Sequence, residues 1–212
     1  MARPKPSKSL TQRLFLSPIS KRIIYCEGKH EYTYLSKLVD LNEIEAYEKG
    51  TELSASAIKL RIMQIERDLN NDAVEQVFWI VDGGDEHIKE SSYFKKFYNK
   101  WLAKKDSDWH KLDILINTPC LEYWFLLHEI DPPIDSESNP ICYADANALY
   151  NSQEFKGTFT NGKGAQLVKV MANNAQGRKN AIERAKKLLS LLDNLNIKKY
   201  FSVARAEFFR LF

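Results

Sequence analysis

Two groups of acidic residues each follow an apolar run that is typical of a buried strand. Glu27 comes directly after the run at residues 22–26, and Asp82 and Asp85 come after the run at residues 77–81. In an open parallel sheet, ligands bind beyond the carboxyl ends of the strands. If the two strands are neighbours, these carboxylates converge, and converging carboxylates are what a hard cation such as Mg²⁺ requires. The spacing therefore points to a metal-dependent reaction on a phosphate group.

The first acidic group also has a structural interpretation. Glu27 precedes Gly28, which lets the backbone turn tightly, and the acid could simply cap a helix or favour its positive end. Glu31, one turn later, either supports a metal site or pairs with Lys29. Both alternatives stay open from the residues alone.

The second acidic group is denser. Asp82, Asp85 and Glu86 repel one another unless a cation or a basic group lies nearby. Gly83-Gly84 gives the loop freedom to fold carboxylates around an ion, although an acidic turn between a strand and a helix is the alternative. His87 could be a proton shuttle, a metal ligand or a surface residue.

A third candidate begins at Asn117, which leaves another predicted strand. Pro119 is expected at the first position of a helix, a place that proline favours. A helix N-terminus at the carboxyl edge of a sheet binds anions readily. Glu122 would lie in the first turn, where it either aims into the same cleft or caps the helix.

The elements that must position these residues alternate along the chain. Short apolar runs predict strands, and apolar residues at helical spacing predict the helices between them. The predicted strands are residues 21–26, 44–47, 74–81 and 112–116, and the predicted helices are 31–39, 58–69, a segment opened by Ser91 or Ser92, and 121–130. This order predicts an α/β fold with a mainly parallel central sheet and helices on both faces.

The character of the chain changes after residue 130. A proline-rich loop at 131–140 precedes segments of helical pattern at about 143–155, 164–173 and 178–194. The apolar end at residues 201–212 should pack either on the core or on a partner. We therefore expect a tail at 1–20, an α/β domain at 21–130 and a helical C-terminal extension at 131–212.

Bulk composition excludes several classes of protein. The chain has 212 residues and a net charge of +3, which is too weak a balance to demand nucleic acid but compatible with it. Its three cysteines are far apart, which argues against a zinc cluster or a disulfide framework. No apolar run approaches the length needed to span a bilayer, so we expect a cytoplasmic protein without a membrane partner.

Three motifs together resemble the RloB-like family of the Toprim superfamily. They are Cys26-Glu27-Gly28 with Glu31, the acidic cluster at 82–87, and the string Asn-Thr-Pro-Cys-Leu-Glu-Tyr-Trp-Phe-Leu-Leu-His at 117–128. The resemblance implies a Toprim fold in which Glu27 and the Asp82–Asp85 motif hold Mg²⁺ (or Mn²⁺) and cut or join nucleic-acid phosphodiesters. It also implies a role in phage defence or abortive infection, often beside an ATPase.

The leading hypothesis is therefore a Mg²⁺-dependent nuclease acting on DNA or RNA. Its expected catalytic residues are Glu27, Asp82 and Asp85; the expected metal ligands are these three and Glu31; the expected supporting residues are His87, Asn117, Glu122 and Lys29. The usual Toprim pattern is Asp-x-Asp, whereas Gly83-Gly84 separates the two aspartates here. That spacing favours an alternative, a non-catalytic subunit that binds a nucleic acid or nucleotide and meets an ATPase partner. Phosphoryl or nucleotidyl transfer on a small nucleotide is a third option.

Overall fold

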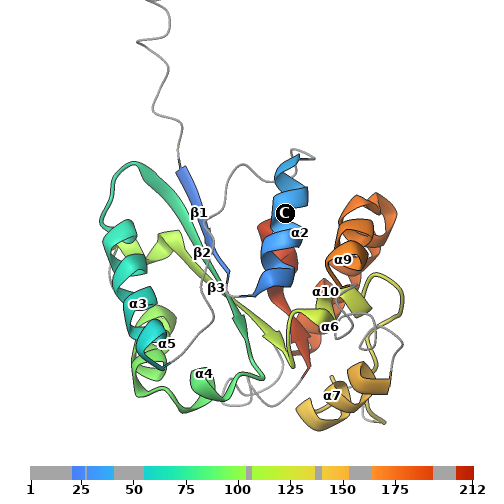
Figure 1. The fold of residues 1–212 in the computed structure, drawn as a ribbon. Coiled ribbons are helices and arrows are strands. Elements are labelled where there is room, and N and C mark those ends of the chain that lie inside the picture. The colour runs from blue at the N-terminus through green and yellow to red at the C-terminus, as the bar shows by residue number, and fades with distance from the viewer. Residues whose placement is uncertain are drawn as a thin grey trace, which may run out of the picture.

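A four-stranded sheet runs through the middle of the computed structural model and carries helices on both faces (Figure 1). The structure describes residues 21–26, 28–40, 55–103, 107–136, 140–152, 164–192 and 204–212. The strands lie in the order β1-β2-β3-β4. Their bounds are β1 (Lys21–Tyr25), β2 (Val74–Asp82), β3 (Leu112–Thr118) and β4 (Arg205–Ala206).

The first three strands are parallel, so their carboxyl ends meet at one edge of the sheet. Tyr25 pairs with Trp79 in the β1–β2 register, and Asp82 pairs with Asn117 in the β2–β3 register. The fourth strand is antiparallel to β3 and comes from the far end of the chain. The α/β fold and its mainly parallel sheet, as predicted from the alternating pattern, are confirmed.

The central strand β2 shows why the apolar runs form buried strands. Its residues from Val77 to Val81 are all buried, because helices cover both faces of the sheet. Successive side chains of a strand point to opposite faces. Accordingly Phe78 and Ile80 enter one core, whereas Trp79 and its neighbours Val77 and Val81 enter the other.

One face of the sheet is covered by α3 (Ala55–Leu69) and α5 (Ser92–Ala103), with the 3₁₀ turn η1 (Ser107–Lys111) beside them. Aromatic rings dominate this core: Trp79 makes edge-to-face contacts with Phe94 and Phe97. The short α4 (Glu86–Glu90) lies between β2 and α5. The prediction that Ser91 or Ser92 opens α5 is confirmed for Ser91, whose Oγ accepts a hydrogen bond from the Phe94 N–H at 3.1 Å.

The other face carries α2 (Lys29–Asp40), α6 (Glu122–Leu126) and α10 (Ala175–Leu192), and α9 (Gly164–Asn173) packs against α2 (Figure 1). The helix α7 (Tyr143–Ser152) lies between α6 and α9 in the chain. The helices predicted at 31–39, 58–69, after Ser91 and after residue 130 are therefore present. The predicted strand at 44–47 lies outside the described residues, and the expected domain boundaries stay predictions.

The apolar end of the chain packs on the core. Phe208 is fully buried, and its ring lies against Tyr34 and Trp124 with centroids 5.4 and 5.5 Å apart. This segment forms β4 and the 3₁₀ turn η3 (Glu207–Leu211). Of the two expected places for the apolar end, core or partner, the structure shows the core. No described helix has both the length and the apolar character needed to cross a membrane.

One helix is shorter than expected. The helix predicted over 121–130 is the single turn α6 (Glu122–Leu126), and the chain then continues in turns held by bonds such as His128 N–H to Phe125 O at 3.1 Å. Its residues from Tyr123 to Leu127 are all buried, so no polar face marks where the helix ends. An apolar run buried on every side cannot be assigned by periodicity alone.

Candidate active site

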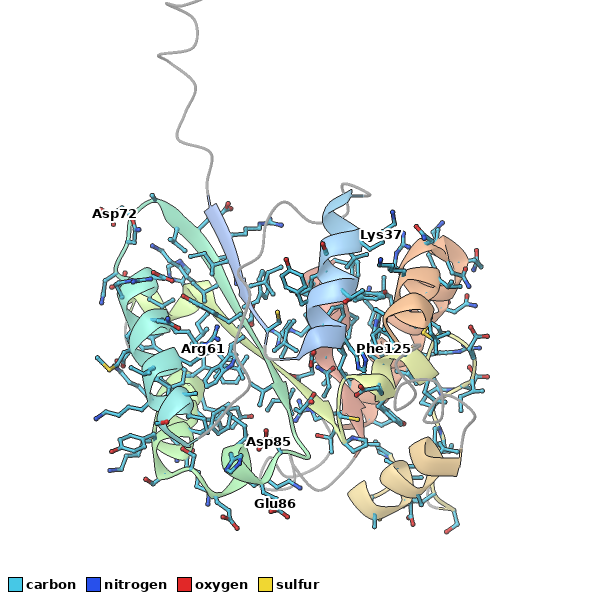
Figure 2. All side chains as sticks on the ribbon, viewed as in Figure 1. Lys37, Arg61, Asp72, Asp85, Glu86 and Phe125 are labelled. Atoms are coloured by element: carbon cyan, nitrogen blue, oxygen red, sulfur yellow. The ribbon has the colours of Figure 1, made fainter. Side chains whose placement is uncertain are left out.

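Asp82 ends β2 at the carboxyl edge of the sheet, where the carboxylates were expected to gather. Its Oδ1 accepts a hydrogen bond from the Leu121 N–H at 2.9 Å, which ties the end of β2 to the segment that follows β3. Figure 2 shows Asp85 and Glu86 at this edge and Asp72 at the opposite one. The parallel pairing of the strands therefore brings the second and third sequence motifs together.

The glycines after Asp82 allow a close approach between the two loops. Gly83 N–H donates to Asn117 O at 2.7 Å, and Gly84 N–H donates to Pro119 O at 2.6 Å. A Cβ atom at Gly83 would collide with Oγ1 of Thr118. The loop is therefore packed against the end of β3, and the glycines serve that contact.

Asp85 has a structural task in this arrangement. Its Oδ1 accepts a hydrogen bond from the His87 N–H at 2.7 Å, which makes it the N-cap of α4. His87 itself is exposed. The acidic turn that the sequence offered as the alternative interpretation is thus present at Asp85, and its role as a metal ligand stays a prediction.

Glu122 projects from α6 toward the start of α2. Its Oε1 lies 2.9 Å from Nδ1 of His30, and the two side chains are 16% and 25% exposed. Burial raises the pKa of Glu122, but hydrogen bonds from His30 and from the Cys120 thiol outweigh it, so its pKa is lowered overall. An ionised carboxylate can only accept, so Nδ1 of His30 is the donor.

Glu31 lies deeper, with 5% of its surface exposed. Burial, reinforced by the negative charge of Glu122, raises its pKa from 4.5 to about 7, although its own backbone N–H and the charge of His30 oppose the rise. Its carboxyl group lies against the Cα of Gly28, where any side chain would collide with it. A side chain at position 28 would therefore require the Glu31 carboxyl group to move.

The pKa of the Cys120 thiol is affected by burial and by two acids, Glu122 and Asp82. Burial raises the pKa of its thiol well above the ordinary value, and the charges of Glu122 and Asp82 raise it further. Asp82 and Glu122 are therefore both within electrostatic reach of one thiol, although they come from different strand ends. A thiol held protonated in this way is a poor nucleophile. The carboxylates, not Cys120, are therefore the candidate reactive groups of the site.

Asn117 pairs with Asp82 in the β2–β3 register, and its side chain binds the C-terminal segment. It is fully buried, and its Oδ1 accepts a hydrogen bond from the Phe208 N–H at 3.3 Å. Among the described residues its Nδ2 finds no partner. Its expected role in binding substrate stays a prediction, because the structure shows it bound to the C-terminal segment.

Two expectations about the third motif are wrong. Pro119 does not begin a helix: the Thr118–Pro119 peptide is cis, and α6 begins at Glu122. The expected anion site at that N-terminus is also absent from the described residues, because the Leu121 N–H is bonded to the protein's own Asp82. A carboxylate of the chain thus occupies the place where a bound anion was expected.

Sequence reasoning missed His30. It lies in the first turn of α2, and its partner Glu122 is 92 residues away. The neighbouring Glu31 and the cluster of charged residues after Cys26 were the only local signal. Because the hydrogen bond joins residues that are distant in sequence, no spacing rule could have identified it.

Part of the predicted metal site cannot be placed. Glu27 and the side chain of Lys29 lie outside the described residues. Within the described part of the chain, no three His, Cys, Asp or Glu side chains are grouped to hold a metal. Mg²⁺ nevertheless needs only one or two carboxylates when waters and substrate phosphates complete its shell. Asp82 and Glu122 supply carboxylate oxygens, which are the type of ligand that Mg²⁺ binds.

Comparison with known proteins places the chain in a family. Neither the curated proteins nor the solved structures yielded a match. A family model described as RloB-like protein matches residues 22–204, which include all three motifs, β1 from Arg22 onward and every element from α2 to α10. Because this match covers most of the 212 residues, the chain belongs to the RloB-like protein family.

Proposed function

We propose that this protein is a divalent-metal-dependent nuclease that cuts nucleic-acid phosphodiesters as part of an anti-phage defence system. The observation that carries the proposal is that Asp82 ends β2 at the carboxyl edge of three parallel strands, and its carboxylate binds the segment that carries Glu122. This edge is where open α/β sheets bind their ligands. The defence context rests on the family and its resemblance to the Toprim superfamily.

In this proposal Glu27, Asp82, Asp85 and Glu31 would hold Mg²⁺ or Mn²⁺. The bound ion would supply polarisation of the phosphate and stabilisation of the leaving oxygen. Burial is the main cause of the raised pKa of Glu31, and the charge of Glu122 adds to it, so a cation beside these two acids would lower that pKa.

The chain's own residues have separate tasks. Leu121 holds the Asp82 carboxylate through its N–H and so fixes one oxygen at the strand end. Glu122 orients the ring of His30 and keeps a proton on its Nδ1. His30 is therefore placed to hold a proton at the edge where the phosphodiester would lie.

The test is cleavage of labelled DNA and RNA with Mg²⁺ or Mn²⁺ present. Glu27→Gln and Asp82→Asn should each abolish cleavage while thermal unfolding stays close to that of the unchanged protein. Asp72→Asn is the matched control, since Asp72 is exposed at the opposite edge of the sheet (Figure 2). Cleavage retained in both Glu27→Gln and Asp82→Asn would refute the nuclease.

The proposed role in phage defence is tested by a separate experiment. The chain, expressed with its neighbouring genes, should reduce phage plaque formation, and Glu27→Gln should remove that protection. Loss of protection with cleavage intact would separate the defence role from the chemistry. Co-purification with an ATPase encoded beside it would support the expected partner.

A non-catalytic role is the second candidate, and one specific observation favours it. Asp85 is used to cap α4, and Glu122 is engaged by His30, so two of the expected acids already have protein partners. In this alternative the carboxyl edge of the sheet binds a nucleic acid or nucleotide, and the chain changes a partner's activity. The pure chain would then bind an oligonucleotide in the presence of Mg²⁺ and Mn²⁺ without cutting it.

A further inference from the structure

The outer face of the α3–α5 layer gathers exposed apolar side chains. Leu60 and Met63 of α3 are 60% and 56% exposed, and Tyr93 of α5 is 51% exposed. Large apolar side chains that are clustered on a surface mark interaction sites more often than scattered ones do. Figure 1 shows α3 and α5 side by side on the face of the sheet opposite to α2 and α9.

A groove runs between these two helices, with a cavity volume of about 290 Å³. Met63, Tyr93 and Phe97 contribute apolar surface to its lining, and Lys59, Lys96 and Lys100 contribute positive charge. The groove is thus apolar in its lining and basic in its charged groups.

Charge within the groove is unbalanced. Glu66 is the one acid among the lining residues, and its carboxylate already pairs with Lys100 at 3.7 Å. Lys59 and Lys96 therefore leave the groove with net positive charge. The Nζ of Lys59 lies 5.5 Å from the centroid of the Tyr93 ring, so the charge stands directly beside the apolar surface.

The C-terminal segment does not compete with this face as a docking surface. Its apolar residues Phe208 and Leu211 are 0% and 7% exposed, because they complete the core on the other side of the sheet, and of residues 204–212 only Phe212, at 41%, is an exposed apolar side chain. A partner that needs exposed apolar surface therefore finds more of it on α3 and α5.

We propose that the α3–α5 groove docks an acidic amphipathic helix of a partner protein. Apolar side chains of that helix would lie between Met63 and Tyr93, and its carboxylates would meet Lys59 and Lys96. Amphipathic helices lie in apolar grooves in this way, and Tyr and Met are enriched at protein interfaces. A nucleic-acid strand fits less well, because its surface is polar and the lining of this groove is largely aliphatic and aromatic.

The experiment measures binding of a fluorescent synthetic helix of about five turns to the full chain. The peptide carries Leu at positions i, i+3, i+4 and i+7 and Glu elsewhere, and a matched peptide carries Lys in place of Glu. We expect the acidic peptide to bind and its affinity to fall as salt is added. The assay contains EDTA, so its outcome does not depend on the proposed nuclease.

Two double variants test the groove from its two sides. Met63→Ser/Tyr93→Ser removes the apolar contacts, and Lys59→Glu/Lys96→Glu reverses the charge. Each double variant should lower the affinity for the acidic peptide about tenfold or more. The matched control is Lys169→Glu/Val170→Ser on α9, where Val170 is 55% exposed, and it should leave binding unchanged. Thermal unfolding of each variant verifies that it folds.

Four results would overturn the proposal. The acidic peptide could fail to bind, or the Lys peptide could bind equally well. Binding could be unaffected by both groove variants. A single-stranded oligonucleotide could bind in place of the peptide and lose its affinity in Lys59→Glu/Lys96→Glu, which would reassign the groove to nucleic acid.

Discussion

Asp82 and Leu121 are 39 residues apart in the chain, yet the Leu121 N–H donates to Asp82 Oδ1 at 2.9 Å. This bond joins the end of β2 to the segment after β3, directly before α6. It gives Asp82 a structural role in addition to the chemical role that we propose.

The two roles of Asp82 can be separated by substitution. Asp82→Asn keeps an oxygen that accepts from Leu121, so its free energy of unfolding should change little. Asp82→Ala leaves that N–H without its partner and should lose about 1–2 kcal/mol. Urea unfolding measures both, and the proposed cleavage should be absent in both. Equal loss of stability in the two variants would contradict the hydrogen bond.

Gly83 should not tolerate a side chain. Its Cβ would collide with Oγ1 of Thr118, so Gly83→Ala should destabilise the fold by about 1–3 kcal/mol. Thr118→Ala/Gly83→Ala removes the colliding oxygen and should recover part of that loss. A double-mutant cycle by urea unfolding gives the coupling, and additive effects of the two changes would show that they do not touch.

Glu31 should make stability fall as pH rises toward neutrality. Its pKa is raised from 4.5 to about 7, so the native state holds a proton between these values that the unfolded state has released. Its contribution to the free energy of unfolding is therefore complete below pH 4.5. That contribution is lost as pH rises through about 7, by about 1.4 kcal/mol per pH unit. Glu31→Gln should lack this loss when unfolding is measured from pH 5 to 8, and a pH profile unchanged by the substitution would contradict the prediction.

His128 should act in the opposite direction. Burial, together with the positive charges of Arg178 and Arg184, lowers its pKa from 6.5 to about 4. The unfolded state binds a proton first as pH falls, so the contribution of His128 is complete above pH 6.5 and is lost down to about pH 4. His128→Gln should flatten the acid side of the stability profile, and NMR titration of the ring should show the low pKa. A His128 ring whose pKa is near 6.5 would refute the prediction.

The C-terminal aromatic cluster should be essential for the core. Phe208 is fully buried against Tyr34 and Trp124, so Phe208→Ala should cost about 3–5 kcal/mol. Phe212 is 41% exposed, and Phe212→Ala is the matched control with a smaller effect. Thermal unfolding compares them, and equal effects would argue against the buried position of Phe208.

The order and type of the main elements could be predicted from the sequence. Buried strands such as β2 are continuous apolar runs, and helices such as α3 and α5 repeat apolar residues every three to four positions. These are local patterns, so the chain alone carries them. The parallel sheet, and the placing of Asp82 at its carboxyl edge, follow from the alternation of the elements.

The contacts within the site were decided by tertiary structure. The pairing of His30 with Glu122, the bond from Leu121 to Asp82 and the antiparallel strand β4 beside β3 all join residues that are far apart in the chain. Local patterns carry no information about such pairs, because the pairs form only when the strands align in register. For the same reason, sequence showed that Asp82 and Asp85 are acidic neighbours, and only the fold directed one to Leu121 and the other to the cap of α4.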